Sequence, residues 1–195
     1  MEKNIVLDNI ISATRPFPHF SSDKILAPEL ADHLLKWLKT SAQWQLTKTS
    51  FYTQYEFSLL DTSLPEELVQ LKSSLLIQEL YAYFTREFRT GTLALVGITA
   101  HKMTDGHRMG VHNDFIGKQE THRLVIQLNE HWNDENGGYL MTFNSSDPKD
   151  VATIMKPLHN SGIGFEISGN SYHAVSTVHA FERYTLVYTF SQISL

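Results

Sequence analysis

From about residue 91 to the C-terminus, the sequence is a series of short apolar segments separated by turn-forming stretches. The turn-forming stretches, rich in Gly, Asn, Asp and Ser, are 104–106, 133–138, 144–148 and 168–170. The segments with the length and side chains of strands are 93–99, 124–128, 139–143, 163–167 and 184–190. Short strands at this spacing are typical of an antiparallel sandwich, jelly roll or small barrel, and they argue against βαβ units.

The first 90 residues carry helical patterns instead. The segment 27–39 predicts a helix, with Pro28 in its first turn. Its apolar face consists of Leu30, Leu34, Leu35 and Leu38. A second helix is predicted over 65–88, opened by Pro65 and capped by Thr62 or Ser63. Its apolar stripe consists of Leu68, Leu71, Leu75, Leu80, Tyr83 and Phe84. We therefore expect one mainly β domain over 1–195, in which a helical support (about 1–90) flanks a β-core (about 91–192).

Composition excludes several classes of protein. The 195 residues are 42% hydrophobic, which is enough for a core and too much for a disordered chain. The net charge of −5 has the wrong sign for a partner such as nucleic acid or an anionic membrane. The chain has no cysteine, so thiolate metal sites and disulfides are absent. With no signal segment or membrane-length apolar run in the sequence, we expect a cytoplasmic location.

Two histidines and a carboxylate suggest a metal site. His112 and Asp114 are two residues apart, so in an extended segment both side chains point to one face. His173 follows a Ser-Gly-Asn turn at the start of another strand-like run. Two imidazoles and one carboxylate form the facial triad of non-haem Fe(II) oxygenases, which leaves coordination positions open. Zinc is the alternative metal, but the sequence has no HExxH motif.

Arg183 is a candidate anchor for a second ligand. It lies ten residues after His173, and an even spacing in an extended run returns it to the same face. A guanidinium pairs bidentately with a carboxylate and stays charged at any working pH. The distal carboxylate of 2-oxoglutarate would suit it. The alternative is a solvated arginine paired with Glu182.

These residues lie in segments that resemble a known family. The segments are HND at 112–114, RLVIQLNEHWNDENGGYLMTF at 123–143 and HAVSTVHAFER at 173–183, with a lead-in at 16–38. They resemble the Fe(II)/2-oxoglutarate-dependent dioxygenases of the prolyl-hydroxylase-like group. The resemblance covers roughly half of the chain, and the order and spacing of its motifs are more specific than any one of them.

The resemblance implies a double-stranded β-helix, or jelly-roll, core. It implies that His112, Asp114 and His173 hold Fe(II) and that Arg183 binds 2-oxoglutarate, which reacts with O2 to give succinate and CO2. Ascorbate would be an optional reductant. Relatives often carry a tyrosine where this sequence has Gln127, whose amide can donate the same kind of hydrogen bond to 2-oxoglutarate.

The resulting hypothesis is a dioxygenase that hydroxylates an unactivated C–H bond of an amino acid, a peptide or a small amino-acid-derived metabolite. One alternative is a peptidyl, prolyl-type hydroxylase acting on a protein. The other is a non-catalytic jelly-roll module that binds 2-oxoglutarate or metal. The sequence does not indicate the oligomeric state, or whether the reaction continues to desaturation or ring formation.

Several other residues have a predicted structural role, and some of them also have a possible role at the site. Asp105, His107 and Arg108 are hypothesised to select a polar substrate at the mouth of the site, or else they form a solvated turn. The N-terminal aromatic residues are expected in the core, with a substrate channel as the alternative; they are Trp44, Phe51, Tyr52, Tyr55 and Phe57. The histidines expected at the surface or in hydrogen bonds are His122, His131, His159 and His179. Gly137 and Gly138 are expected to supply positive φ in a turn.

Overall fold

The computed structural model describes residues 4–40, 43–116 and 119–193 and consists of two facing antiparallel sheets with helices on one side. In spatial order, the larger sheet contains β2 (Ile11–Ala13), β3 (His19–Ser22), β12 (Gly162–Glu166), β9 (His122–Gln127), β14 (Arg183–Gln192), β7 (Leu93–Met103), β6 (Thr53–Ser58) and β5 (Gln45–Lys48). The smaller sheet contains β11 (Val151–Met155), β10 (Leu140–Phe143), β13 (His173–Val175) and β8 (Met109–His112). A separate pair joins β1 (Ile5–Asp8) to β4 (Lys24–Leu26). The predicted class, mainly β with flanking helices, is confirmed.

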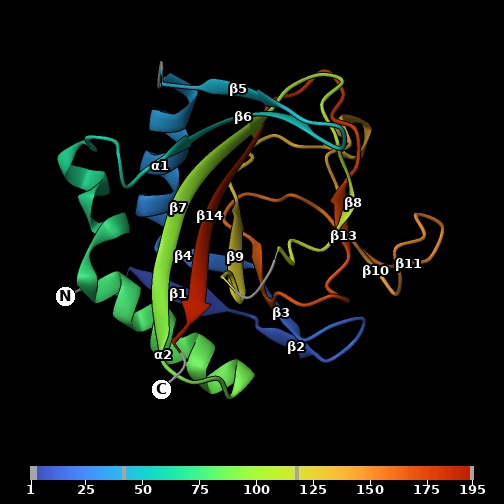
Figure 1. The fold of residues 1–195 in the computed structure, drawn as a ribbon. Helices are drawn as coiled ribbons and strands as arrows, with labels where there is room; N and C mark the ends of the chain where they lie inside the picture. Colours follow the sequence, from blue (N-terminus) through green and yellow to red (C-terminus); the bar gives the residue numbers. More distant parts are fainter. Residues whose placement is uncertain (1–3, 41–42, 117–118, 194–195) are drawn as a thin grey trace.

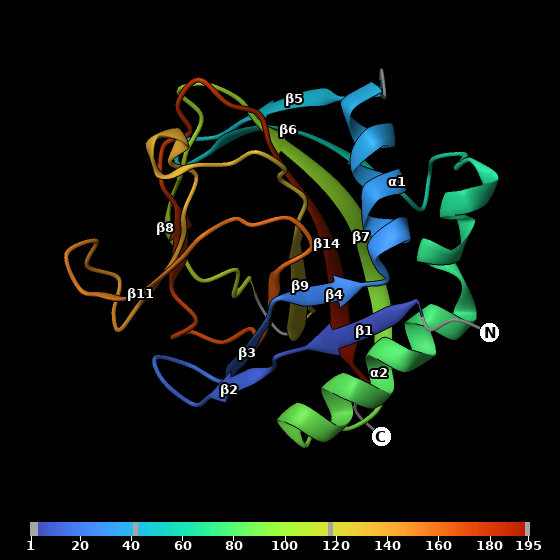
Figure 2. The same cartoon turned by 180° about the vertical axis from the view of Figure 1, so that it is seen from behind.

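The helices cover the outer side of the larger sheet, and the smaller sheet faces its inner side (Figures 1 and 2). The predicted first helix is α1 (Pro28–Thr40), with its four leucines buried. The predicted second helix is interrupted: a 3₁₀ helix, η1 (Glu66–Lys72), precedes α2 (Ser74–Phe88). Ser73 separates them because its side chain accepts a hydrogen bond from the Leu76 amide and so caps α2.

Two details of the predicted second helix are wrong. Thr62 does not cap it, because its hydroxyl donates to the Ser58 carbonyl. Leu75 is 54% exposed, because the new helix start at Ser74 places it on the solvent side. None of the described helices is both long enough and apolar enough to cross a membrane.

The C-terminal strand β14 is buried along most of its length because both of its faces are covered. Its even-numbered side chains pack in the core beneath the helices; they are Tyr184, Leu186, Tyr188 and Phe190. Its odd-numbered side chains line a cavity between the two sheets; they are Arg183, Thr185, Val187 and Thr189. Alternation along a strand thus separates the stabilising face from the face that builds the site.

The N-terminal part contributes strands as well as helices. Strands β3, β5 and β6 belong to the larger sheet, and β6 pairs directly with β7. The expected helical support before residue 90 therefore also supplies strands to the sheet. These strands are short and contain many polar residues, so they lack the apolar runs that mark the later strands.

His122 is buried and hydrogen-bonded, with Nδ1 at 2.9 Å from the Thr121 hydroxyl, which fits the second of the two expected settings. Its burial makes folding sensitive to acid. Its side chain is 2% exposed, packs against Phe84 and Phe88, and leaves Nε2 without a partner. Burial lowers the pKa of His122 from 6.5 to about 4. The unfolded chain binds a proton at His122 more readily than the folded chain does. The contribution of neutral His122 to the free energy of unfolding is therefore present above pH 6.5 and is lost as the pH falls toward 4. At about 1.4 kcal/mol per pKa unit, the loss is about 3 kcal/mol.

We therefore expect His122→Phe to flatten the pH dependence of the free energy of unfolding between pH 6.5 and 4. Urea titrations across this range measure it. The matched control is His131→Gln, because His131 is exposed. An equally steep loss of stability in His122→Phe would assign the acid sensitivity to other groups.

Candidate active site

The cavity between the sheets has a volume of about 670 Å³ and contains the predicted triad. One ligand atom from each of His112, Asp114 and His173 lies within 4.8 Å of the other two. His112 Nε2 is 3.4 Å from Asp114 Oδ1, and His173 Nε2 is 3.2 Å from Asp114 Oδ2. His112 on β8 and His173 on β13 are directly paired across the smaller sheet. The structure thus brings together three side chains that are distant in the sequence.

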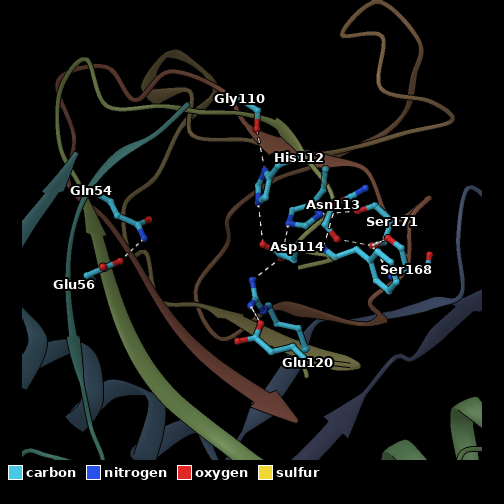
Figure 3. Close-up of polar contacts among 12 residues, drawn as sticks. Gln54, Glu56, Gly110, His112, Asn113, Asp114, Glu120, Ser168 and Ser171 are labelled. Atoms are coloured by element: carbon cyan, nitrogen blue, oxygen red, sulfur yellow. Dashed lines mark hydrogen bonds and ion pairs between the residues drawn. The ribbon is translucent and has the colours of Figure 1, made fainter. Parts of the chain in front are cut away.

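The His112–Asp114 approach depends on a turn, and the expected extended segment is not formed. Strand β8 ends at His112, and Asp114 has φ of 57°. Asn113 shapes this turn: its side-chain oxygen accepts from the Phe115 amide, and its amide donates to the Gly169 carbonyl. Ser171 donates from its hydroxyl to the Asn113 carbonyl at 2.8 Å (Figure 3). These contacts tie the Asp114 turn to the loop before His173.

Backbone carbonyls fix the protonation of both histidines. His112 Nδ1 lies 2.9 Å from the Gly110 carbonyl, and His173 Nδ1 lies 2.8 Å from the Ser171 carbonyl. A carbonyl only accepts, so each Nδ1 carries the proton and each Nε2 presents a lone pair toward Asp114. Neutral imidazoles and a carboxylate arranged in this way fit a divalent iron.

Asp114 is held in its ionised form. Burial alone would raise its pKa, but the charge of Arg123, which donates to Oδ2, brings the pKa of Asp114 below its usual value. Burial lowers the pKa of His173, and Asp114 only partly offsets this. Both shifts favour the deprotonated forms of Asp114 and His173, which metal binding requires.

Arg123 is a site residue that the sequence analysis did not single out. One NH group donates to Asp114 Oδ2, and the other donates to Glu120 at 2.6 Å. Arg123 is the first residue of the segment 123–143 that carries the family resemblance. The sequence therefore marks its position, but it does not show that Arg123 contacts Asp114. Its contact orients the carboxylate of Asp114.

Arg183 lines the same cavity as the triad. The even spacing from His173 in one extended run, from which this was predicted, is not the cause. The chain from His173 does not stay extended: β13 ends at Val175, Ala180 has φ of 47°, and Arg183 begins a strand of the other sheet. Arg183 therefore enters the cavity from the larger sheet and His173 from the smaller sheet, so the two do not share one strand face.

The Arg183 guanidinium is a buried cation that fits a carboxylate ligand. The residue is 4% exposed, and burial lowers its pKa to about 10. Its Nε donates to the Gly138 carbonyl at 2.9 Å, and an NH group contacts Met103 Sδ at 3.9 Å. Within the described ranges, no Asp or Glu oxygen lies within 4.0 Å of it, so Glu182 is not its partner. A buried guanidinium without a counter-charge suits the distal carboxylate of 2-oxoglutarate.

Gly138 makes this placement of Arg183 sterically possible. Gly137 and Gly138 have φ of 59° and 67°, which confirms the expected turn. A Cβ atom on Gly138 would lie 2.9 Å from Arg183 Cδ. A larger residue would therefore push the guanidinium from its position.

Gln127 faces inward but lies apart from the triad. It pairs with Thr185 across β9 and β14, so both side chains are on the cavity face of the sheet. Its side chain, 3% exposed, lines a second cavity of about 250 Å³, and its Oε1 has no partner. Leu140 lines both cavities. A contact between Gln127 and 2-oxoglutarate stays a prediction.

Asp105, His107 and Arg108 do not line the cavity of the triad, contrary to their hypothesised role at its mouth. The Asp105 carboxylate accepts from the Ala180 amide, and His107 stacks on Tyr55. The alternative reading, a turn, holds for Asp105. The upstream residue that does line the cavity is His101 on β7.

The N-terminal aromatic residues divide between core and cavity. Trp44 and Phe57 pack against each other in the core beneath the helices, as expected. Phe51 and Tyr52 line the cavity, and Phe51 packs against the His112 ring. The core expectation is wrong for these two because the turn between β5 and β6 reaches over the smaller sheet, where Tyr52 bridges to Met109.

The other histidines take no part in the cluster. His159 pairs with Asp32 at 3.0 Å, as a hydrogen-bonded histidine. His131 and His179 are exposed. These three fit the expectation from the sequence.

Two facing antiparallel sheets with a His-Asp-His cluster between them fit the metal site of non-haem iron proteins. Residues 98–191 match the family model described as "2OG-Fe(II) oxygenase superfamily". The matched segment covers about half of the chain and includes the three ligand residues and Arg183, and it supports a 2-oxoglutarate-dependent iron dioxygenase, which would use Fe(II), 2-oxoglutarate and O2. The predicted enzyme class is thus confirmed.

Solved structures confirm the jelly-roll fold. A Pseudomonas putida prolyl-4-hydroxylase is 17% identical, covers 90% of this chain and 93% of its own, and has a TM-score of 0.73. A Trichoplax adhaerens prolyl hydroxylase, solved with a peptide fragment of the hypoxia inducible factor oxygen degradation domain, is 13% identical, with 89% and 83% coverage and a TM-score of 0.74. A 2OG-Fe(II) oxygenase family oxidoreductase from Burkholderia pseudomallei is 20% identical, with 93% and 84% coverage and a TM-score of 0.64. No curated protein sequence matches the chain.

Proposed function

We propose that the enzyme hydroxylates an unactivated C–H bond of an amino acid, a peptide or a small amino-acid-derived metabolite. In this proposal His112, Asp114 and His173 hold Fe(II), and Arg183 binds the distal carboxylate of 2-oxoglutarate. The observation that carries it is one cavity that holds both the three convergent ligand atoms and a buried guanidinium without a counter-charge.

Each residue has a defined task in the reaction. When bound, the iron supplies the redox chemistry that couples oxidative decarboxylation of 2-oxoglutarate to substrate oxidation. The Gly110 and Ser171 carbonyls keep His112 and His173 in the tautomer that presents Nε2. Arg123 orients Asp114. Apolar residues along the cavity limit the access of water; they include Met103, Met109, Val125, Leu140 and Val187.

A second candidate is a peptidyl hydroxylase acting on a protein. It is supported by the fold likeness to prolyl hydroxylases, one of which was solved with a peptide fragment. The cavity can take either a side chain of a peptide or a small metabolite, so its volume is compatible with both candidates. Screening free amino acids against peptides by mass spectrometry separates the two candidates.

The proposed function predicts a visible absorption band when Fe(II) and 2-oxoglutarate are added together without oxygen. It also predicts succinate formation once air is admitted, at a rate that rises with a substrate. Spectrophotometry and a succinate assay measure the two signals. A protein that binds Fe(II) but shows neither the band nor succinate would contradict the proposal.

A further inference from the structure

Glu56 places a carboxylate in the active-site cavity, facing the triad. It lies on β6 and pairs in register with His101 on β7, which in turn pairs with Thr185 on β14. Directly paired residues share a face, so the three side chains form a row across the inner surface of the larger sheet, and all three line the cavity. Figure 3 shows Gln54 and Glu56 on the opposite side of this space from His112 and Asp114.

Neutral donors hold the Glu56 carboxylate in place. Thr47 donates from its hydroxyl to Oε1 at 2.8 Å, and Gln54 donates from its amide to Oε2 at 2.8 Å. These hydrogen bonds orient the carboxylate but do not neutralise its charge.

The cations of the cavity are committed elsewhere. Arg123 pairs with Asp114 and Glu120, and Arg183 lies against Gly138 and Met103. In the part of the chain that the structure describes, no Lys or Arg nitrogen lies within 4.0 Å of Glu56. His101 Nε2 is 4.0 Å away, but burial lowers the pKa of His101 to about 4, so this ring is neutral at pH 7. Among the described residues, the Glu56 carboxylate therefore has hydrogen-bond donors but no Lys or Arg counter-ion.

Part of the mouth of the cavity is apolar. Phe51, Val96 and Ile116 line it and are exposed, Ile116 to 89%. A ligand that fits this wall has an aliphatic or aromatic part in addition to a charged group. A second anion would be repelled by Glu56, whereas a cation would find its counter-charge there.

We propose that the substrate carries a cationic nitrogen group, an ammonium or a guanidinium, that pairs with Glu56 while its apolar part lies along the mouth of the cavity. This inference rests on the proposed function. It makes Glu56 a specificity-determining residue of the reaction, on the wall opposite the metal ligands. A charged hydrogen bond of this kind distinguishes a cationic substrate from its neutral isostere.

Matched pairs of probes test the proposal on the full-length enzyme loaded with Fe(II) and 2-oxoglutarate. The cationic probes are L-lysine and L-arginine, free and as Nα-acetyl amides. Their neutral counterparts are norleucine and citrulline in the same two forms. Succinate formation above the rate without probe gives an apparent KM for each. We expect at least one cationic probe to stimulate turnover, with an apparent KM at least about 10-fold below that of its neutral counterpart.

Variants assign this preference to Glu56. In Glu56→Gln the ratio between the neutral and cationic KM values should fall close to one, and Glu56→Asp should retain part of it. The matched control is Glu66→Gln, because Glu66 is an exposed glutamate of η1. It should keep the full ratio.

Two results would overturn the inference while the proposed function stands. The first is an enzyme that forms the Fe(II)–2-oxoglutarate band and succinate but is stimulated by no cationic probe, or equally by neutral ones. The second is a preference for cations that Glu56→Gln leaves unchanged. If the unsubstituted enzyme does not form the Fe(II)–2-oxoglutarate band at all, that result contradicts the proposed function and not this inference alone.

Discussion

Replacing His112 with alanine is expected to abolish the visible band formed with Fe(II) and 2-oxoglutarate and to reduce succinate formation to background. His112 supplies one of three convergent ligand atoms, and without it only Asp114 and His173 remain to bind the metal. The loss should exceed the roughly 10–100-fold effect typical of removing an outer partner of a ligand. Anaerobic titration with Fe(II), followed by spectrophotometry, measures it.

His131→Ala is the matched control, because His131 is exposed and lies outside the cluster. It should leave both the band and the turnover intact. Thermal unfolding of both variants shows whether the fold is retained. An unchanged band in folded His112→Ala would remove His112 from the ligand set.

Replacing Arg183 with leucine is expected to raise the 2-oxoglutarate concentration needed for half-maximal turnover by about 10–150-fold, the effect of losing a charged hydrogen-bond partner. Iron binding should persist, because Arg183 contacts none of the three ligands. The fold should tolerate the change, since it removes a buried charge that lacks a counter-charge. Arg183→Lys should have an intermediate effect, because an ammonium keeps the charge but not the planar pair of donors.

A co-substrate without a distal carboxylate distinguishes recognition from indirect damage. The unsubstituted enzyme should prefer 2-oxoglutarate strongly over 2-oxobutyrate. Arg183→Leu should use the two 2-oxo acids with similar efficiency. If the variant instead loses iron, or keeps its preference for 2-oxoglutarate, then Arg183 does not bind the distal carboxylate.

The sequence predicted the strands that contain continuous apolar runs and missed those that do not. The five expected segments after residue 91 correspond to β7, β9, β10, β12 and β14. Strands β5 and β6 were missed because most of their residues are polar and because β6 is stabilised by pairing with β7, a contact between distant segments. The break at Ser73 was missed because the apolar spacing continues across it.

In the candidate site, the sequence predicted which residues come together but not how. His112 and Asp114 were expected to meet through strand alternation, and the structure uses a turn shaped by Asn113. Arg183 was expected on the same strand face as His173, and it faces the cavity from the other sheet. Spacing rules assume one continuous element, and here each pair spans two elements.

The roles of Arg123 and Glu56 could not be predicted from composition or motifs. Both are ordinary charged residues in the sequence. What distinguishes them is the identity of their neighbours, Asp114 in one case and neutral donors in the other. These neighbours are set by strand register and loop conformation, which a single sequence does not reveal.

The hydrogen bonds that link Asn113 with Gly169 and Ser171 have a thermodynamic consequence for ion capture. They join the Asp114 turn to the loop that precedes His173. The entropic cost of ordering these two segments is therefore met during folding and not when the ion binds. Such preorganisation strengthens binding of any divalent ion of suitable size. Discrimination among metals then falls to the hardness of the donor atoms and to which metal the cell makes available.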